Sequence, residues 1–254
     1  MRIGAEATKS VASNLKPPTA EGLPMKIGTI QKFSLIDYPG KISAVIGTQG
    51  CNMRCFWCHN CYLIPHDCSS SFQPIEEEDF FQFLNERVNF LDAVVISGGE
   101  PTLHADLLEF CQRIKVLGFN VKLDTNGTNP AMLQELIDAG LLDYVAMDVK
   151  TDAEQYDKLC GEKMEMDAII ASINIILSAN MPYEFRTTCV APFVCRDNIE
   201  DLAKMISGAK LYYLQKCVEK KNLNRKDFYR ALDDEELTEL KFKAAPYAEM
   251  CAIR

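Results

Sequence analysis

The chain has 254 residues, of which 48% are apolar and 25% are charged, and its formal net charge is −9. These values are ordinary for a globular protein and allow one larger domain or two small ones. The negative charge argues against a general affinity for nucleic acid or for an anionic membrane surface. No apolar stretch reaches the roughly 18 residues of a membrane-spanning helix. From the charge and from this absence we expect neither nucleic acid nor membrane as a partner.

The first 24 residues differ from the rest of the chain. They are rich in Ala, Ser, Thr, Lys and Pro, and they show no lasting hydrophobic period. They also lack the apolar core of a secretory signal peptide. We predict a disordered N-terminal extension over residues 1–24, with a start codon assigned too early or a targeting peptide as alternatives. Residues 25–254 are predicted to form a single domain that ends in a helical segment.

From residue 25 onward, short apolar runs alternate with longer amphipathic stretches. The short runs are apolar on both faces, which is typical of parallel strands that are covered on both sides of a sheet. Six such strands are predicted, at residues 42–48, 93–97, 120–124, 144–148, 183–189 and 211–215.

Segments with helical spacing and recognisable ends lie between the predicted strands. A cluster of acids from Glu76 to Asp79 suits a helix N-terminus, and the pair Asn129-Pro130 favours another. The predicted helices cover residues 76–91, 107–117, 130–139, 167–178, 198–207 and 234–245. Strands that alternate with helices in this way predict an α/β fold with a parallel sheet and right-handed crossovers. The pattern alone does not decide whether that sheet closes into a barrel.

Polar and glycine-rich residues follow the predicted strands at the points where the strands end. In chain order they are Cys51 to Cys58, Ser97 to Pro101, Asp124 to Gly127, Asp148 to Lys150, Arg186 with Thr188, and Gln215. The carboxyl ends of parallel strands meet at one edge of a sheet, and the sites of parallel α/β proteins form there. The sequence therefore predicts one functional site at this edge.

Three cysteines, Cys51, Cys55 and Cys58, stand within eight residues, so their thiols can all reach one small inorganic centre. A structural metal site normally has a complete coordination shell, whereas a site that performs chemistry leaves a position open. The chain has eleven cysteines, but its length, the odd count and the place of several of them inside apolar patterns argue against a disulfide framework. A reducing cytoplasm fits this pattern better and leaves the three thiols free to bind metal.

Residues at the other strand ends allow two interpretations each. Gly98 and Gly99 let the backbone approach a ligand closely, but many tight turns after strands look the same. Asp124 could hold a ribose hydroxyl or a cation, or it could cap the following turn. Lys150 could face a ligand or form a buried ion pair with Asp124, and Trp57 could stack on a planar ring or pack in the core.

The cysteine segment Cys-Asn-Met-Arg-Cys-Phe-Trp-Cys-His-Asn resembles the C-x3-C-x-aromatic-C signature of the radical S-adenosylmethionine (radical SAM) enzymes. The resemblance continues, in the order of the family, through residues 98–101, 124–127 and 148–150. Within the superfamily the chain is most similar to activating enzymes of glycyl-radical enzymes, and residues 28–40 resemble the N-terminus of the activating proteins of anaerobic ribonucleoside-triphosphate reductase. The likeness covers about residues 25–215. It implies a partial (β/α)6 barrel of parallel strands with an open side.

The resemblance also implies cofactors and their ligands. It implies one [4Fe–4S] cluster held by Cys51, Cys55 and Cys58, with S-adenosylmethionine chelating the fourth iron. The other cofactor-binding residues that it implies are Trp57, Gly98, Gly99, Glu100, Asp124, Thr125, Asp148, Lys150 and, with weaker support, Arg186. It implies no catalytic residue beyond the cluster and the cofactor.

The implied reaction is reductive cleavage of S-adenosylmethionine to a 5′-deoxyadenosyl radical, which removes a hydrogen atom from a glycine of a partner enzyme. That partner is implied to be an anaerobic ribonucleoside-triphosphate reductase, and a low-potential donor such as flavodoxin would supply the electron. The short stretch after the sixth predicted strand leaves little room for a substrate domain, which favours a protein substrate.

Two alternatives stay open. One is a radical SAM enzyme that acts on a small molecule, of the deazapurine-synthase type. The other is a non-enzymatic protein in which Cys61 completes a four-cysteine zinc site with Cys51, Cys55 and Cys58. The zinc alternative leaves the residues at the other strand ends unexplained. Cys61 stands where many activases have proline, and we interpret it as a bystander, with a spare or alternative cluster ligand as the other interpretation; the role of Cys68 stays open.

Overall fold

The computed structural model describes residues 25–64, 73–160, 163–218 and 228–254. The predicted N-terminal extension and Cys68 lie outside the described residues, so the extension stays a prediction and the role of Cys68 stays open. Among the described residues, none of the helices combines the length and the hydropathy that a membrane span requires.

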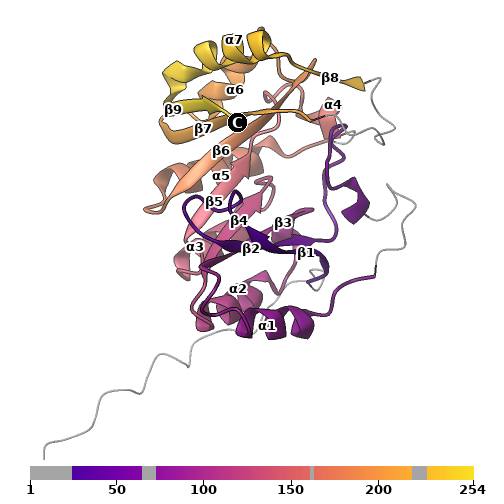
Figure 1. Cartoon of the computed structure of the whole chain (residues 1–254). Helices are drawn as coiled ribbons and strands as arrows, with labels where there is room; N and C mark the ends of the chain where they lie inside the picture. Colours follow the sequence, from indigo (N-terminus) through magenta and orange to yellow (C-terminus); the bar gives the residue numbers. More distant parts are fainter. Residues whose placement is uncertain (1–24, 65–72, 161–162, 219–227) are drawn as a thin grey trace, which may run out of the picture.

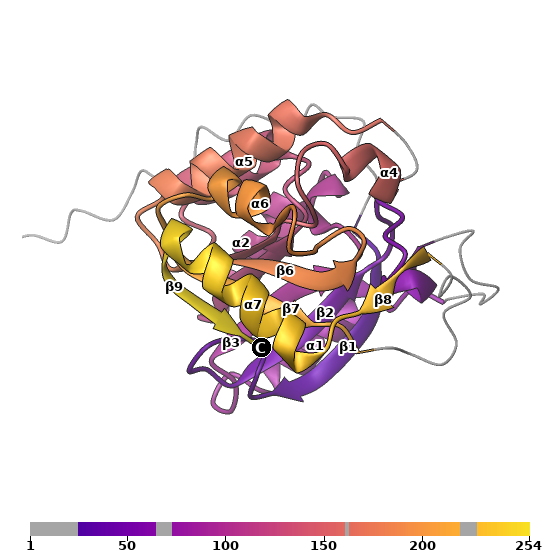
Figure 2. The same cartoon turned by 90° about the horizontal axis from the view of Figure 1, so that it is seen from above.

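One curved sheet forms the centre of the molecule (Figures 1 and 2). Its strands are β1 (Ile27–Ser34), β2 (Ser43–Thr48), β3 (Ala93–Gly98), β4 (Asn120–Thr125), β5 (Tyr144–Asp148), β6 (Tyr183–Ala191), β7 (Ala209–Lys216), β8 (Arg230–Ala231) and β9 (Ala248–Ile253). The order across the sheet is β1-β2-β3-β4-β5-β6-β7-β9, and β8 pairs with β6. β2 to β7 and β9 run parallel to their neighbours, whereas β1 is antiparallel to β2 and β8 is antiparallel to β6.

Helices connect the parallel strands. They are α1 (Glu77–Asn85), α2 (Leu107–Val116), α3 (Pro130–Asp138), α4 (Tyr156–Cys160), α5 (Met166–Ser178), α6 (Ile199–Met205) and α7 (Asp234–Ala244). α1 and α2 lie beside the first strands, and α6 and α7 lie beside β7 and β9 (Figure 1). Their ends follow from the sequence, because Asn129 caps α3 ahead of Pro130 and Asp233 forms a capping box with Glu236 at α7.

The two faces of the sheet bury different side chains, because successive residues of a strand point to opposite faces. Val94 and Ile96 of β3 belong to the main apolar core, which also contains the buried residues of the helices. Ala93 and Val95 instead belong to a small second cluster with Tyr38 and Tyr144. The second cluster therefore lies on the inner face of the sheet. Its member Tyr38 comes from the loop after β1, which packs onto this face.

The inner face also carries buried charges next to this second cluster. Lys122 of β4 is 2% exposed, and its ammonium donates a hydrogen bond to the Asp37 carbonyl at 2.7 Å. It also lies 3.6 Å from a Glu184 carboxylate oxygen and 3.8 Å from one of Asp124. Lys122 thus ties the loop after β1 to the strands that form the site, because a buried ammonium needs such partners.

The fold confirms the predicted class, a partial barrel of parallel strands, and the six predicted strands correspond to β2 to β7. Beyond them, the structure adds the edge strands β1 and β9, the short β8 and helix α4, none of which the sequence analysis predicted. The C-terminal segment therefore holds a strand as well as the predicted helix. The prediction that the first helix reaches residue 91 is wrong: α1 ends at Asn85, and Val88 lies beyond it with 46% exposure.

Candidate active site

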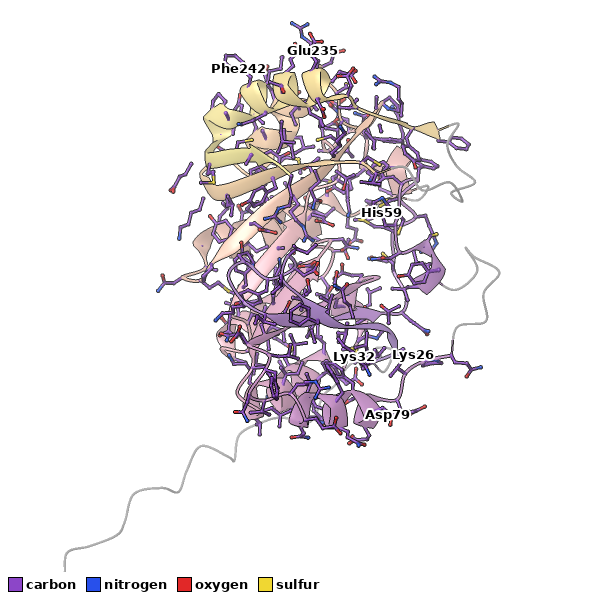
Figure 3. The ribbon with its side chains drawn as sticks, viewed as in Figure 1. Lys26, Lys32, His59, Asp79, Glu235 and Phe242 are labelled. Carbon is purple, nitrogen blue, oxygen red and sulfur yellow. The ribbon has the colours of Figure 1, made fainter. Side chains whose placement is uncertain are left out.

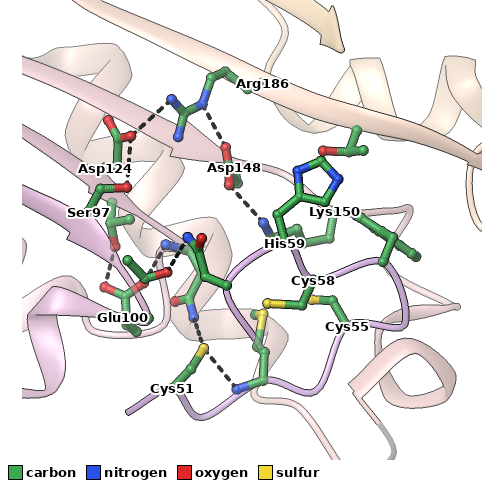
Figure 4. Close-up of a pocket in the computed structure, with 18 of the residues that line it drawn as sticks. Cys51, Cys55, Cys58, His59, Ser97, Glu100, Asp124, Asp148, Lys150 and Arg186 are labelled. Carbon is green, nitrogen blue, oxygen red and sulfur yellow. Dashed lines mark hydrogen bonds and ion pairs between the residues drawn. The ribbon is translucent and has the colours of Figure 1, made fainter. Parts of the chain in front are cut away.

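The predicted site residues line one pocket at the C-terminal ends of β2 to β7 (Figure 4). Its volume is about 390 Å³, within the range that accommodates a cofactor-sized ligand. All twelve residues predicted to hold the cluster or S-adenosylmethionine are among its lining residues: Cys51, Cys55, Trp57, Cys58, Gly98, Gly99, Glu100, Asp124, Thr125, Asp148, Lys150 and Arg186. The sheet brings them together because the register of the parallel strands aligns their carboxyl ends. For example, Asp148 of β5 is paired with Arg186 of β6.

The cysteine loop forms one wall of this pocket. The Cys58 N–H donates to the Cys55 carbonyl at 3.1 Å, which closes a tight turn, and the Arg54 guanidinium donates to the Cys51 carbonyl at 2.6 Å. His59 lies next to this turn (Figure 3), where one of its ring nitrogens is 3.0 Å from the Val218 carbonyl oxygen after β7. These contacts hold the loop across the end of the barrel.

Burial governs the acidity of the loop thiols. It raises the pKa of both Cys51 and Cys55 to about 12, so these two thiols are protonated at neutral pH in the metal-free chain. A metal centre would displace those protons, because the thiolate is the form that binds metal. A cationic inorganic centre would therefore compensate the burial that disfavours the thiolates of Cys51 and Cys55 in the metal-free chain.

Cys61 lies in a different position from the three predicted ligands. It begins the short 3-10 turn Cys61–Leu63 and is not among the residues that line the pocket. Among the described residues, no three Cys, His, Asp or Glu side chains gather closely enough to hold one metal ion. A four-cysteine zinc site requires such a group, whereas a [4Fe–4S] cluster is a larger centre whose cysteines bind different irons.

Trp57 packs in the core, which was one of the two interpretations of this residue, and its stacking on a ligand ring stays a prediction. Its side chain is 4% exposed and packs against Phe193 and Tyr229, with ring centroids 5.5 and 6.2 Å away. The neighbouring Phe56 stacks on Phe193 as well, at 5.5 Å. Trp57 also contributes to the pocket wall. The aromatic contacts therefore anchor the cysteine loop to the core beside the pocket.

The glycine pair at the end of β3 is required by packing within the protein, which supports the second of its two interpretations, a tight turn after a strand. A Cβ on Gly99 would lie 1.9 Å from the Gly50 carbonyl oxygen, and a Cβ on Gly98 would lie 2.4 Å from the Thr48 nitrogen. Gly98 also has a φ of +104°, which L side chains rarely adopt. The pair thus lets the end of β3 pack directly on the residue that precedes Cys51.

We expect Gly99→Ala to displace this packing and to impair the cysteine loop. The new methyl group would force Gly50 to move, at a cost of about 1–3 kcal/mol in unfolding free energy, and iron uptake on reconstitution should fall. Gly118→Ala is the control, because a Cβ there meets open space and only the φ of +88° opposes it. A Gly99→Ala protein with normal stability and iron content would contradict this account.

Glu100 links the end of β3 to the end of β4 through hydrogen bonds to its buried carboxylate. Its carboxylate is 1% exposed and accepts hydrogen bonds from the Thr102 N–H and hydroxyl, at 3.1 and 2.6 Å. It also accepts from the Thr125 hydroxyl at 2.8 Å and from the Asn126 N–H at 2.7 Å. Burial raises the pKa of Glu100, while these four donors oppose the shift. The protein's own groups therefore occupy this carboxylate, which positions the turn after β4.

Alternating charges continue across the other side of the pocket (Figure 4). Arg186 donates from Nε to an Asp148 oxygen at 2.7 Å and from Nη1 to Asp124 Oδ2 at 3.1 Å. Lys150 pairs with the second Asp148 oxygen at 2.7 Å, so the alternative interpretation of Lys150, an ion pair with Asp124, is wrong in its partner. Burial opposes the charge on Asp148, but Arg186 and Lys150 outweigh it and hold the pKa of Asp148 well below its usual range.

One polar atom in the pocket has no hydrogen-bond partner among the described residues. Asp124 Oδ1 is buried and accepts no hydrogen bond, the Lys122 ammonium being 3.8 Å away from it, whereas Oδ2 accepts from Ser97 Oγ at 3.2 Å and from Arg186. A buried acceptor of this kind is costly unless a ligand donates to it. A hydroxyl or amino group of a bound cofactor would satisfy it. The thiols, the open acceptor and the flanking cations together fit a cluster with a polar, zwitterionic cofactor.

Comparison with known families agrees with this geometry. The model of the radical SAM superfamily matches residues 45–207, which is more than half of the chain. The chain belongs to the radical SAM superfamily. It therefore uses a [4Fe–4S] cluster and S-adenosylmethionine. The pocket residues described above fit both groups by their donor chemistry.

Individual relatives extend this comparison. The chain is 38% identical over 236 residues to a Methanocaldococcus jannaschii protein named as a glycyl-radical enzyme activating enzyme, covering 90% of this chain and 95% of that one. It is 34% identical to the 7-carboxy-7-deazaguanine synthase of Halobacterium salinarum, but over only 35% of this chain and 33% of that one. Among solved structures, Streptococcus suis SuiB bound to S-adenosylmethionine has a TM-score of 0.60 at 15% identity, over 80% of this chain and 48% of that chain. The last likeness concerns the fold.

The pocket also contains residues to which the sequence analysis gave no role. Asp37, from the loop after β1, reaches the pocket wall together with Met53. Asn60 donates to the Gly98 carbonyl at 3.0 Å, and Asn126 donates to Cys51 Sγ at 3.9 Å. Asn60 and Asn126 stand directly inside the quoted motifs, so their place in those motifs was the available signal. Asp37 also stands in a quoted segment, residues 28–40, but nothing in the sequence indicates that this segment reaches the strand ends.

Proposed function

We propose that this chain is an activase that generates the glycyl radical of a partner enzyme, and that the partner is an anaerobic ribonucleoside-triphosphate reductase. The observation that carries the proposal is where residues 28–40 lie. This segment, which resembles the N-terminus of the reductase-activating proteins, forms β1 and the loop whose Asp37 reaches the pocket. The 38% identity to a relative named as a glycyl-radical enzyme activating enzyme, over nearly its whole length, supports the activase class.

In this proposal Cys51, Cys55 and Cys58 hold the cluster. The acids and cations after β4, β5 and β6 would hold S-adenosylmethionine: Asp124 offers its open acceptor, while Lys150 and Arg186 offer cationic donors. When bound, the cluster and S-adenosylmethionine supply the one-electron chemistry that removes a hydrogen atom from carbon. The task of this chain's residues is to orient the cofactor and exclude water.

The two sides of the pocket are held rigidly for that task. Glu100 fixes the turn after β4 through four hydrogen bonds, and Arg186 bridges β4 to β5 through two carboxylates. Because both groups are locked by their partners, little motion is needed to orient a bound cofactor. The open side of the sheet, beside the loop after β1, is where we expect a glycine-bearing loop to enter.

The direct test is to mix the anaerobically reconstituted protein with S-adenosylmethionine, a low-potential reductant and the anaerobic ribonucleoside-triphosphate reductase of the same organism. Electron paramagnetic resonance (EPR) should show a glycyl radical that is absent when the reductase carries alanine at its radical position. Reduced flavodoxin should replace the chemical reductant. The proposal also places the protein in a reducing cytoplasm, where thiols stay available to bind a metal centre.

The small-molecule alternative predicts a different dependence of S-adenosylmethionine cleavage on the added substrate. A deazapurine-synthase type of enzyme would cleave S-adenosylmethionine at a rate that depends on a purine precursor and is indifferent to the reductase. Cleavage without any glycyl radical, together with turnover of such a precursor, would contradict our proposal. A colourless protein with one tightly bound zinc would contradict both enzyme assignments.

A further inference from the structure

Asn126 lies between the cysteine loop and the turn after β4, and its side chain meets the sulfur of a predicted cluster ligand. It is 6% exposed. Its amide nitrogen donates to Cys51 Sγ at 3.9 Å and to Asn52 Oδ1 at 3.0 Å. A second donor reaches the same sulfur, because the Met53 N–H lies 3.4 Å from Cys51 Sγ. Cys51 therefore receives a hydrogen bond from a residue of another strand end.

The orientation of this amide is fixed by its other end. Asn126 Oδ1 accepts from the Thr128 N–H at 3.0 Å and from the Thr128 hydroxyl at 2.7 Å. A backbone N–H can only donate, so the oxygen must face Thr128 and the NH2 group must face Cys51. Asn52 completes the arrangement by donating to Thr128 Oγ1 at 2.9 Å. The donor that faces the sulfur thus belongs to a closed network.

The backbone of Asn126 is held as firmly as its side chain. Its N–H donates to the buried Glu100 carboxylate at 2.7 Å, and the next N–H, of Gly127, donates to Thr125 Oγ1 at 3.1 Å. Glu100 is in turn fixed by Thr102. A chain of hydrogen bonds therefore runs from the turn after β3, through Asn126, to the sulfur of Cys51.

We propose that Asn126 is a positioning residue that sets the reduction potential of the cluster through its hydrogen bond to Cys51. The inference rests on the proposed function, because it takes Cys51 as a cluster ligand. When the cluster accepts one electron from its donor, negative charge on the thiolate sulfurs grows. An N–H donor aimed at that sulfur stabilises the reduced form and raises the potential. Removing the donor should make the cluster harder to reduce.

The experiment is an anaerobic redox titration of the reconstituted full chain, with the reduced cluster followed by EPR, for the wild type and two variants. Asn126→Ala removes the donor, and Asn126→Asp replaces it with a carboxylate oxygen beside the sulfur. At the wild-type midpoint, we expect the ratio of reduced to oxidised cluster to fall about threefold in Asn126→Ala. In Asn126→Asp it should fall about tenfold, which equals about 59 mV for one electron.

Thr128→Val is the matched control. It removes the hydroxyl contacts but keeps the backbone N–H that orients Asn126, so its reduced-to-oxidised ratio should stay within about twofold of the wild type. Fully iron-loaded Asn126 variants with the wild-type potential would overturn the inference and show that the residue is only structural. A wild-type chain that takes up no [4Fe–4S] cluster would instead overturn the proposed function itself.

A measurement on the unmodified protein covers the case in which the Asn126 variants do not fold. Wild-type protein labelled with ¹⁵N-asparagine should show, in pulsed EPR of the reduced cluster, a coupling to a side-chain nitrogen transmitted through the hydrogen bond to sulfur. The Asn52 amide donates to Thr128 rather than to a sulfur, so Asn126 is the expected source. A labelled protein with a reduced cluster and no such coupling would overturn the inference.

Discussion

Replacing Cys55 by serine is expected to abolish the cluster and to lower the cleavage of S-adenosylmethionine by at least about 100-fold. Cys55 is a predicted iron ligand in the pocket wall, and iron–sulfur clusters are held by soft thiolates for which a hydroxyl is a poor substitute. The measurements are iron and sulfide content, the brown absorbance after anaerobic reconstitution, and the yield of 5′-deoxyadenosine with a low-potential reductant.

Cys61→Ser is the matched control for this experiment. Cys61 stands three residues beyond Cys58 but lies outside the pocket lining, so its loss should leave both the cluster and the cleavage intact. If Cys61→Ser loses the cluster while Cys55→Ser keeps it, the ligand assignment is wrong. The comparison also decides whether a nearby protein thiol competes for the position reserved for S-adenosylmethionine.

Replacing Arg186 by methionine is expected to destabilise the protein by about 3–5 kcal/mol, because it removes the shared partner of two carboxylates. Arg186 is 12% exposed and contacts Asp124 and Asp148 at 3.1 and 2.7 Å. Without it, Asp148 keeps Lys150, but the nearest cation to Asp124 is Lys122 at 3.8 Å. Urea unfolding of the metal-free protein under anaerobic conditions measures the change.

Arg196→Met serves as the control, because its ion pair with Glu239 is largely exposed and should contribute at most about 1 kcal/mol. The pH dependence gives a second check. The pKa of Asp148 is lowered in the folded protein, so its stabilising contribution is present above the unfolded-state pKa and is lost as the pH falls through the folded-state value. Arg186→Met should weaken that acid dependence. Equal stability of the two variants would contradict the role given to Arg186 as the shared partner of Asp124 and Asp148.

The strands of the parallel sheet could be predicted because each is a short, doubly buried apolar run between amphipathic helices. The edge strands could not. β1 has polar residues such as Gln31 and Lys32 in its second half, and β9 contains Glu249, so neither shows the continuous apolar run that marked the others. Both form because a neighbouring strand, β2 or β7, offers backbone N–H and C=O groups for pairing. Only the folded structure brings that strand alongside, so the local sequence does not indicate it.

The site was predictable where a residue type has one chemical use, and less so where its use depends on partners. Three closely spaced thiols indicated a metal centre by themselves. The role of Glu100 was not readable, because two of the groups that donate to its carboxylate, from Thr125 and Asn126, lie 25 and 26 residues away in the chain. The sequence left the glycine pair open between ligand approach and a tight turn, because the atoms that exclude a side chain belong to Gly50 and Thr48. The roles of Glu100 and of the glycine pair therefore depend on contacts between strand ends, which the sequence does not show.

The most direct measurement of the central claim is hydrogen transfer from the partner's glycine. Anaerobic ribonucleoside-triphosphate reductase with α-deuterated glycine is mixed with the reconstituted chain, S-adenosylmethionine and reductant, and the 5′-deoxyadenosine is analysed by mass spectrometry. We expect about one deuterium in the 5′-deoxyadenosine for each glycyl radical formed. Cleavage that yields 5′-deoxyadenosine without deuterium, and a reductase without a radical, would contradict the assignment of this pocket as the site of a glycyl-radical activase.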